Sequence, residues 1–221
     1  MKTLLFDACD ILYHRPFYDD KLDSFFGPEW RRRHQQNAGA LKKLHQQAAR
    51  GKLSTQQLFD GILEIYNWPS ERLDEGRRFL HETMEDVEFF DGVAPSLHRL
   101  KADGFRLAII TNSFQSQETK LTWFAKAGIE HIWDAFICSS QTGLFKPEPE
   151  IYLEALRQVQ SRPDEAAFIA HSANELEGAK TVGLTTIAYN RDDESVSADH
   201  IIGHFAELVE LAAELRGKPQ S

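Results

Sequence analysis

The stretch that decides the fold is TLLFDACDIL at residues 3–12. Its first four residues, Thr3–Phe6, form a short and mostly apolar run that ends abruptly at Asp7. A continuous apolar run of this length is typical of a strand buried inside a parallel sheet. Ligands bind such sheets at the carboxyl ends of the strands. The residue that ends the run, Asp7, is therefore the first candidate for a functional site.

The chain beyond residue 88 alternates between apolar runs and helical patterns. The apolar runs predict further strands over 106–110, 135–138, 166–170 and 185–189. The helical patterns predict helices over 93–103, 119–126, 148–159, 174–181 and 204–215. Strands that alternate with helices form βαβ units and a parallel sheet. We therefore predict the α/β class, with a Rossmann-like parallel sheet and helices on both faces.

From about residue 17 to residue 83 the pattern is helical throughout. Leu58 and Ile62 recur at helical spacing, and Ser54 with Gln57 matches a capping box at a helix start. This helical segment interrupts the α/β pattern directly after the first strand. We therefore expect an all-α cap over 14–87, inserted into a core formed by 1–13 and 88–221.

Composition limits the classes of function. The 221 residues carry 25 Lys and Arg against 34 Asp and Glu, a net charge of −9. Such a chain repels nucleic acid and anionic membranes on average, so any anion site must be a local exception. Two cysteines, Cys9 and Cys138, leave one disulfide open, but reduced thiols are the preferred interpretation. With no 18-residue apolar run, we expect a cytoplasmic monomer or homodimer that binds neither membrane nor nucleic acid.

Chemically useful side chains follow several of the predicted strands. They are a carboxylate at Asp7, a hydroxyl at Thr111, an ammonium at Lys146 and a second acid at Glu175. His171 comes directly after the strand at 166–170. A carboxylate can attack an electrophile while a hydroxyl and an ammonium hold negative charge. The set predicts nucleophilic chemistry on a small anionic substrate.

Four segments of the chain also resemble the motifs of the haloacid dehalogenase-like hydrolase superfamily. The first is LLFD at 4–7 with Leu12, and the second is IITNS at 109–113. The third is GLFKPEPEIY at 143–152, and the fourth spans 168–179. The helical insertion resembles the small cap that the family carries after its first motif.

The resemblance implies a reaction and a role for each residue. Asp7 would attack phosphorus, or carbon in a dehalogenase, to form an aspartyl intermediate, with Thr111 and Lys146 as the other catalytic residues. Asn112 and His171 would contact the substrate. A magnesium ion would be held by Asp7, by the backbone carbonyl of Cys9 and by Glu175.

Two departures from the family pattern weaken this picture. Cys9 stands where phosphatases of the family have a second Asp, and Ala170 stands where a metal-binding Asp belongs. Magnesium binding is therefore expected to be weak or absent. We expect a divergent hydrolase, most readily of a phosphomonoester. Two alternatives stay open: a catalytically impaired protein that binds a metabolite or a protein partner, and a metal-independent enzyme resembling 2-haloacid dehalogenases.

Overall fold

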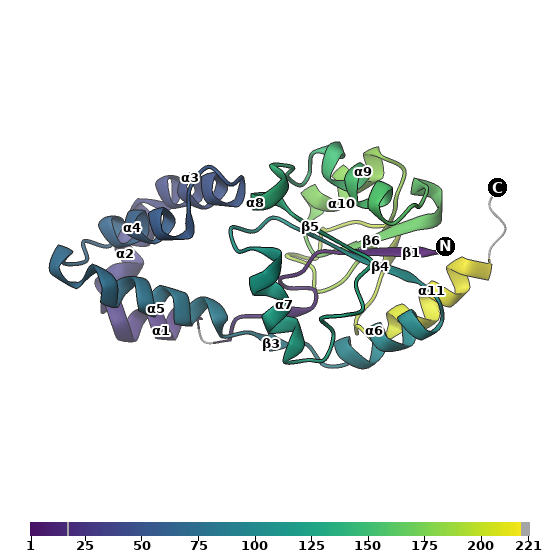
Figure 1. Cartoon of the computed structure of the whole chain (residues 1–221), viewed down its shortest axis with the longest axis horizontal. Helices are drawn as coiled ribbons and strands as arrows, with labels where there is room; N and C mark the ends of the chain where they lie inside the picture. Colours follow the sequence, from purple (N-terminus) through teal and green to yellow (C-terminus); the bar gives the residue numbers. More distant parts are fainter. Residues whose placement is uncertain (17, 218–221) are drawn as a thin grey trace.

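The computed structural model describes residues 1–16 and 18–217, which form a parallel sheet flanked by helices and a separate group of helices (Figure 1). The sheet has six parallel strands in the order β5-β4-β1-β6-β7-β8. Their bounds are β1 Thr3–Phe6, β4 Arg106–Thr111, β5 Ala135–Cys138, β6 Ala166–Ala170, β7 Thr185–Ala188 and β8 His200–Ile201. The predicted fold class is confirmed, and β1 lies in the middle of the sheet between β4 and β6.

Helices cover both faces of the sheet because the strands are apolar on both sides. One face buries side chains of α6 (Val93–Ala102), α7 (Gln117–Ala125) and α11 (Glu207–Gly217). The other buries side chains of α9 (Pro149–Gln158) and α10 (Ala173–Thr181). The predicted helices all form, with ends shifted by up to three residues. A short helix, α8 (Ser139–Thr142), and the edge strand β8 were not predicted.

The predicted helical segment forms five α-helices and a short 3-10 helix, Ser70–Arg72. The α-helices are α1 Tyr18–Phe26, α2 Glu29–Gln36, α3 Ala38–Ala49, α4 Thr55–Ile65 and α5 Leu73–Glu85. They bury a cluster of their own, centred on Leu58, Leu63 and Leu80. The capping box at Ser54 and Gln57 is confirmed. Residue 17, where the predicted segment begins, lies outside the described residues.

The contacts that join these helices to the rest of the molecule include a strand pair and an ion pair. A short antiparallel ribbon pairs β2 (Tyr13–His14) with β3 (Glu88–Phe89) where the chain leaves and re-enters the core. Farther away, Arg50 at the end of α3 forms an ion pair with Glu148, with 2.6 Å between Nη2 and Oε1. The inserted helices therefore contact the rest of the molecule at two separate places, the ribbon and the ion pair. The division into a core (1–13 and 88–221) and a cap (14–87) remains our proposal.

Candidate active site

Asp7 lies at the carboxyl end of the central strand, between the ends of its two neighbours. Its backbone N–H donates to the carbonyl of Ile169 on β6, which continues the strand pairing one residue beyond β1. The residue is buried, with 6% of its surface exposed. A central position in the sheet therefore sets Asp7 beside the residues that follow β4 and β6, which is the convergence that the sequence predicts.

Four charged side chains form a connected cluster around this carboxylate, which we call the Asp7 network: Asp7, Lys146, Glu175 and His171. The Lys146 ammonium lies 2.6 Å from Asp7 Oδ1 and 2.7 Å from Glu175 Oε2. The His171 Nε2 lies 3.4 Å from Asp7 Oδ2. Asp7 Oδ1 also accepts a hydrogen bond of 2.7 Å from the backbone N–H of Ala8. The two oxygens of the nucleophile candidate thus have different surroundings.

Lys146 is held in place by its neighbours on both sides. Its backbone N–H donates to Asn112 Oδ1 and its carbonyl accepts from Asn112 Nδ2, at 2.9 and 3.0 Å. On the other side, α10 packs so closely that a Cβ added to Gly178 would lie 2.5 Å from the carbonyl oxygen of Pro147. This close approach brings Glu175, on the first turn of α10, to the Lys146 ammonium.

The contacts of Asn112 change the interpretation that the sequence suggested. We expected this side chain to contact the substrate. It lines the cavity, but both ends of its amide are bonded to the backbone of Lys146. Its geometry is that of a residue that positions Lys146. Thr111, by contrast, lies at the end of β4 and borders the cavity as expected.

His171 has a partner that the sequence did not reveal. Its Nδ1 lies 2.6 Å from Oδ1 of Asp192, in the segment after β7. Burial disfavours the imidazolium, but the contacts with Asp7 and Asp192 outweigh burial and raise the pKa of His171 to about 9. The imidazole is therefore a cation at neutral pH while Asp7 is ionised.

The two carboxylates of the network have pKa values that move in opposite directions. Burial disfavours the ionised form of both. For Asp7, the attraction of Lys146 and His171 outweighs burial, so its pKa lies well below the usual range. For Glu175, burial and the negative charge of Asp7 prevail over Lys146, and its pKa is raised. Asp7 is thus the acid that stays ionised, as a nucleophile requires.

This donor set does not fit a magnesium ion, which prefers six oxygen ligands at octahedral positions. The Lys146 ammonium lies between Asp7 and Glu175, the imidazole of His171 lies against the other Asp7 oxygen, and Ala170 offers no donor. Within residues 1–16 and 18–217, no three His, Cys, Asp or Glu side chains are grouped as metal ligands. The predicted ligand set of Asp7, Cys9 and Glu175 is therefore not supported by the geometry, because cationic side chains occupy the positions around the carboxylates.

The cavity in front of Asp7 has a volume of about 250 Å³. Beyond the Asp7 network and Thr111, its polar lining consists of Cys9, Tyr13, Arg15, Asn112, Ser113, Gln115 and Lys120. Burial raises the pKa of the Cys9 thiol to about 11, so the thiol stays protonated. Both cysteines are free, which agrees with the expectation of reduced thiols.

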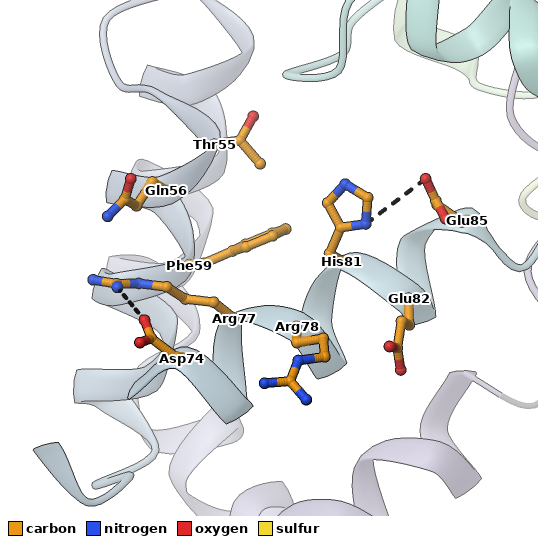
Figure 2. A pocket seen from close by; sticks show the side chains of 9 residues that line it. All are labelled: Thr55, Gln56, Phe59, Asp74, Arg77, Arg78, His81, Glu82 and Glu85. Atoms are coloured by element: carbon orange, nitrogen blue, oxygen red, sulfur yellow. Dashed lines mark hydrogen bonds and ion pairs between the residues drawn. The ribbon is translucent and has the colours of Figure 1, made fainter. Parts of the chain in front are cut away.

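A larger cavity of about 720 Å³ lies among the helices inserted after β1 and contains none of the predicted site residues. Figure 2 shows that its charged groups face one another: Arg77 is turned to Asp74, and His81 to Glu85. A third cavity of about 200 Å³ shares Phe59 and His81 with this one and Phe114 and Gln115 with the Asp7 cavity. Of these three cavities in the described residues, only the one of about 250 Å³ combines the buried Asp7 carboxylate with buried cations, so it is the candidate active site.

Known proteins resemble the chain along most of its length. A (S)-2-haloacid dehalogenase 4A of Burkholderia cepacia is 24% identical over 190 residues, which cover 84% of this chain and 80% of the relative. A glyceraldehyde 3-phosphate phosphatase of Methanothermobacter thermautotrophicus is 28% identical over 125 residues. That match spans only 54% of this chain and 54% of the phosphatase, and the chain likewise covers 57% of the corresponding phosphatase of Methanopyrus kandleri.

The fold has solved counterparts. The structure of an L-2-haloacid dehalogenase from Xanthobacter autotrophicus superposes with a TM-score of 0.70 at 16% identity, covering 97% of this chain and 99% of that one. In the described residues, no helix is both long and apolar enough to cross a membrane. The family model described as haloacid dehalogenase-like hydrolase matches residues 22–189, a range that begins after Asp7 but includes the second, third and fourth motifs. The chain belongs to the haloacid dehalogenase-like hydrolase family.

Proposed function

We propose that the protein is a metal-independent hydrolase that uses Asp7 to displace a halide, or a similarly stable anion, from a small carboxylic acid. The observation that carries the proposal is the position of Asp7, ionised between Lys146 and His171 where a metal-dependent enzyme would need oxygen ligands. The length over which the chain matches a 2-haloacid dehalogenase supports the same reaction.

The first step forms an ester. Asp7 Oδ2 is the less firmly held of the two carboxylate oxygens, with His171 at 3.4 Å, and it attacks the carbon that carries the halogen. The carbon–oxygen bond forms as the carbon–halogen bond breaks, and the halide leaves with the bonding electrons. A halide needs no proton to leave. An alkoxide does, and Cys9, with a thiol pKa of about 11, is a poor acid for that task.

The second step hydrolyses the ester with the remaining contacts. Oδ1 becomes the ester carbonyl oxygen, and the Ala8 N–H and the Lys146 ammonium already point at it from 2.7 and 2.6 Å. These two donors stabilise the negative charge that develops when water adds to the carbonyl carbon. In comparable sites each such donor lowers the activation free energy by roughly 2.7–4 kcal/mol. Glu175 and Asn112 keep Lys146 in position.

His171 is the base of the second step. Esterification removes the negative charge of Asp7, which is a main cause of the raised pKa of His171, so the imidazolium can release its proton to solvent. Asp192 holds the Nδ1 proton, which leaves Nε2 free to accept a proton from water. Nε2 then returns that proton to the departing alkoxide, giving the hydroxy acid, and the regenerated Asp7 carboxyl transfers its own proton to His171.

Chloride release from 2-chloropropionate in the presence of a chelator tests the proposal. We expect release without added metal, and we expect no stimulation by magnesium. Phosphomonoester hydrolysis is the second candidate, favoured by the similarity to the phosphatase relatives, and it predicts phosphate release that requires magnesium. A folded protein that turns over neither class would support the third alternative, a binding protein without activity.

A further inference from the structure

One cation of the Asp7 cavity takes no part in the steps above. Lys120 lies on α7 and is 2% exposed, and its ammonium borders the same cavity. It has one hydrogen bond in the described chain, which Nζ donates to the hydroxyl of Tyr13 at 2.7 Å. No carboxylate of residues 1–16 or 18–217 lies within ion-pair distance of it. A buried ammonium without a counter-ion is costly, and side chains of this kind are normally paired.

A second unpaired cation lies on the same side of the cavity. Arg15 donates weakly to the carbonyl of Met84, at 3.4 Å, and to the Cys9 sulfur, at 3.9 Å, and forms no ion pair within the described ranges. The ring of Trp123 faces both cations, at 5.7 Å from Arg15 and 5.2 Å from Lys120. We call Lys120, Arg15 and Tyr13 the Lys120 pocket.

The charges around the whole cavity leave room for an anion. Its lining contains four cations when His171 is protonated and two carboxylates, Asp7 and Glu175. Lys146 and His171 are engaged with those carboxylates, so the surplus of positive charge belongs to Arg15 and Lys120. In a chain with a net charge of −9, this surplus is a local exception of the kind that an anionic ligand requires.

The geometry points to the Lys120 pocket as the binding site for the carboxylate of the substrate. Resting on the proposed function, this assigns the two ends of the substrate to two sides of one cavity. The carboxylate contacts Lys120 and Arg15, while the carbon that carries the leaving group faces Asp7. The bound carboxylate supplies the counter-ion that Lys120 lacks in the protein itself. The class of substrate is thus a short acid rather than a neutral halide.

The test compares the binding of propionate with that of propionamide, which has the same shape without the charge. Neither molecule carries a leaving group, so binding is measured without any turnover, by NMR titration of the full chain at pH 7. We expect propionate to bind more tightly than propionamide. Lys120→Met should weaken propionate binding by at least about 30-fold, as truncation of one partner of a buried charge pair does, and leave propionamide unchanged.

Lys43→Met is the matched control, because Lys43 is exposed on α3 and does not border the cavity. It should bind propionate like the unaltered protein. A folded Lys120→Met protein that retains full propionate affinity, or equal binding of propionate and propionamide by the unaltered chain, would overturn the assignment. Because no reaction is involved, a failure of chloride release would leave this result intact, and the converse also holds.

Discussion

Lys146 and Lys120 are two buried ammonium groups that line one cavity, and they differ in whether a carboxylate lies beside them. Lys146 lies between two carboxylates, whose attraction outweighs burial and raises its pKa. In the described residues the Lys120 ammonium has a tyrosine hydroxyl and an aromatic ring as neighbours but no carboxylate, and burial, reinforced by nearby Arg15, lowers its pKa to about 8. The protein therefore neutralises Lys146, the cation that contacts the candidate nucleophile, and leaves Lys120 in the same cavity without a counter-ion. The comparison teaches that the Asp7 network is complete without a ligand, whereas the Lys120 pocket is not.

Within the Asp7 network, removal of the nucleophile should cause the largest loss of activity. Asp7→Asn keeps the size of the side chain and removes the attacking oxygen, so chloride release should fall by roughly 10⁴-fold or more. Asp20→Asn, on the exposed face of α1, is the control and should keep full activity. Substantial chloride release by an Asp7→Asn protein whose sequence has been verified would mean that another residue is the nucleophile.

Replacing each of the two lysines by Met should change the free energy of unfolding in different ways. Lys146→Met leaves Asp7 and Glu175 without their shared cation, and loss of one partner of a buried ion pair costs about 3–5 kcal/mol. Lys120→Met removes a buried charge that has no counter-ion, so its free energy of unfolding should be equal to or higher than that of the unaltered protein.

Urea unfolding of the two variants, measured at pH 7 beside Lys43→Met, checks this difference. Equal losses of stability at positions 146 and 120 would mean that Lys120 has a compensating partner within the protein. That result would remove the contrast between Lys146, which has counter-ions, and Lys120, which has none.

His171→Asn should affect the second step more than the first. Without the base, hydrolysis of the ester should slow by roughly 10²–10⁴-fold, and the esterified Asp7 peptide should accumulate and be visible by mass spectrometry after rapid quenching. Asp192→Asn should act in the same direction with a smaller effect, since Asp192 orients the imidazole. Slow chloride release without accumulated ester would place His171 in the first step instead.

The pH dependence of substrate binding should report on Lys120. Its pKa in the folded protein is about 8, below its usual value, so the ammonium is present at pH 7 and is lost as pH rises through about 8. The affinity for propionate should therefore decrease above that pH, by about tenfold for each pH unit once the neutral amine dominates, since only the charged form binds the anion.

Stability should change with the opposite sign over the same range. Between the folded pKa of about 8 and the higher pKa of the unfolded chain, the unfolded state binds more protons, so this residue adds stability as pH rises. Lys120→Met should remove the part of both dependences that belongs to this residue, while His171, with a pKa of about 9 in the same cavity, keeps a dependence of its own. An affinity for propionate that stays constant from pH 7 to pH 9.5 would contradict the role of Lys120.

The sequence predicted the sheet and the residues at its edge because both follow local rules. Buried strands appear as apolar runs, and parallel strands bring their carboxyl ends together, so Asp7, Thr111, Lys146 and Glu175 could be expected in one place. Three-dimensional contacts decided the rest. Asn112 had the residue type of a substrate ligand, yet its amide is bonded to the backbone of Lys146.

The residues that the sequence did not identify are those whose partners come from remote segments. Lys120 sits among ordinary helix residues, and only the packing of Tyr13 and Trp123 around it reveals a buried cation. Asp192 follows β7 with no distinguishing pattern, and only the strand order brings it to His171. A cytoplasmic location and a monomeric or dimeric state stay predictions.

The most direct test of the central claim, an ester on Asp7 formed without metal, uses water labelled with oxygen-18. The protein is incubated with a chelator and excess 2-chloropropionate in the labelled water, and the Asp7 peptide is analysed by mass spectrometry. Hydrolysis at the carbonyl carbon of the ester puts solvent oxygen into the carboxylate, so the account predicts labelled Asp7. Turnover that leaves Asp7 unlabelled while the hydroxy acid carries the label from the first turnover would contradict it, because water would then attack the substrate directly.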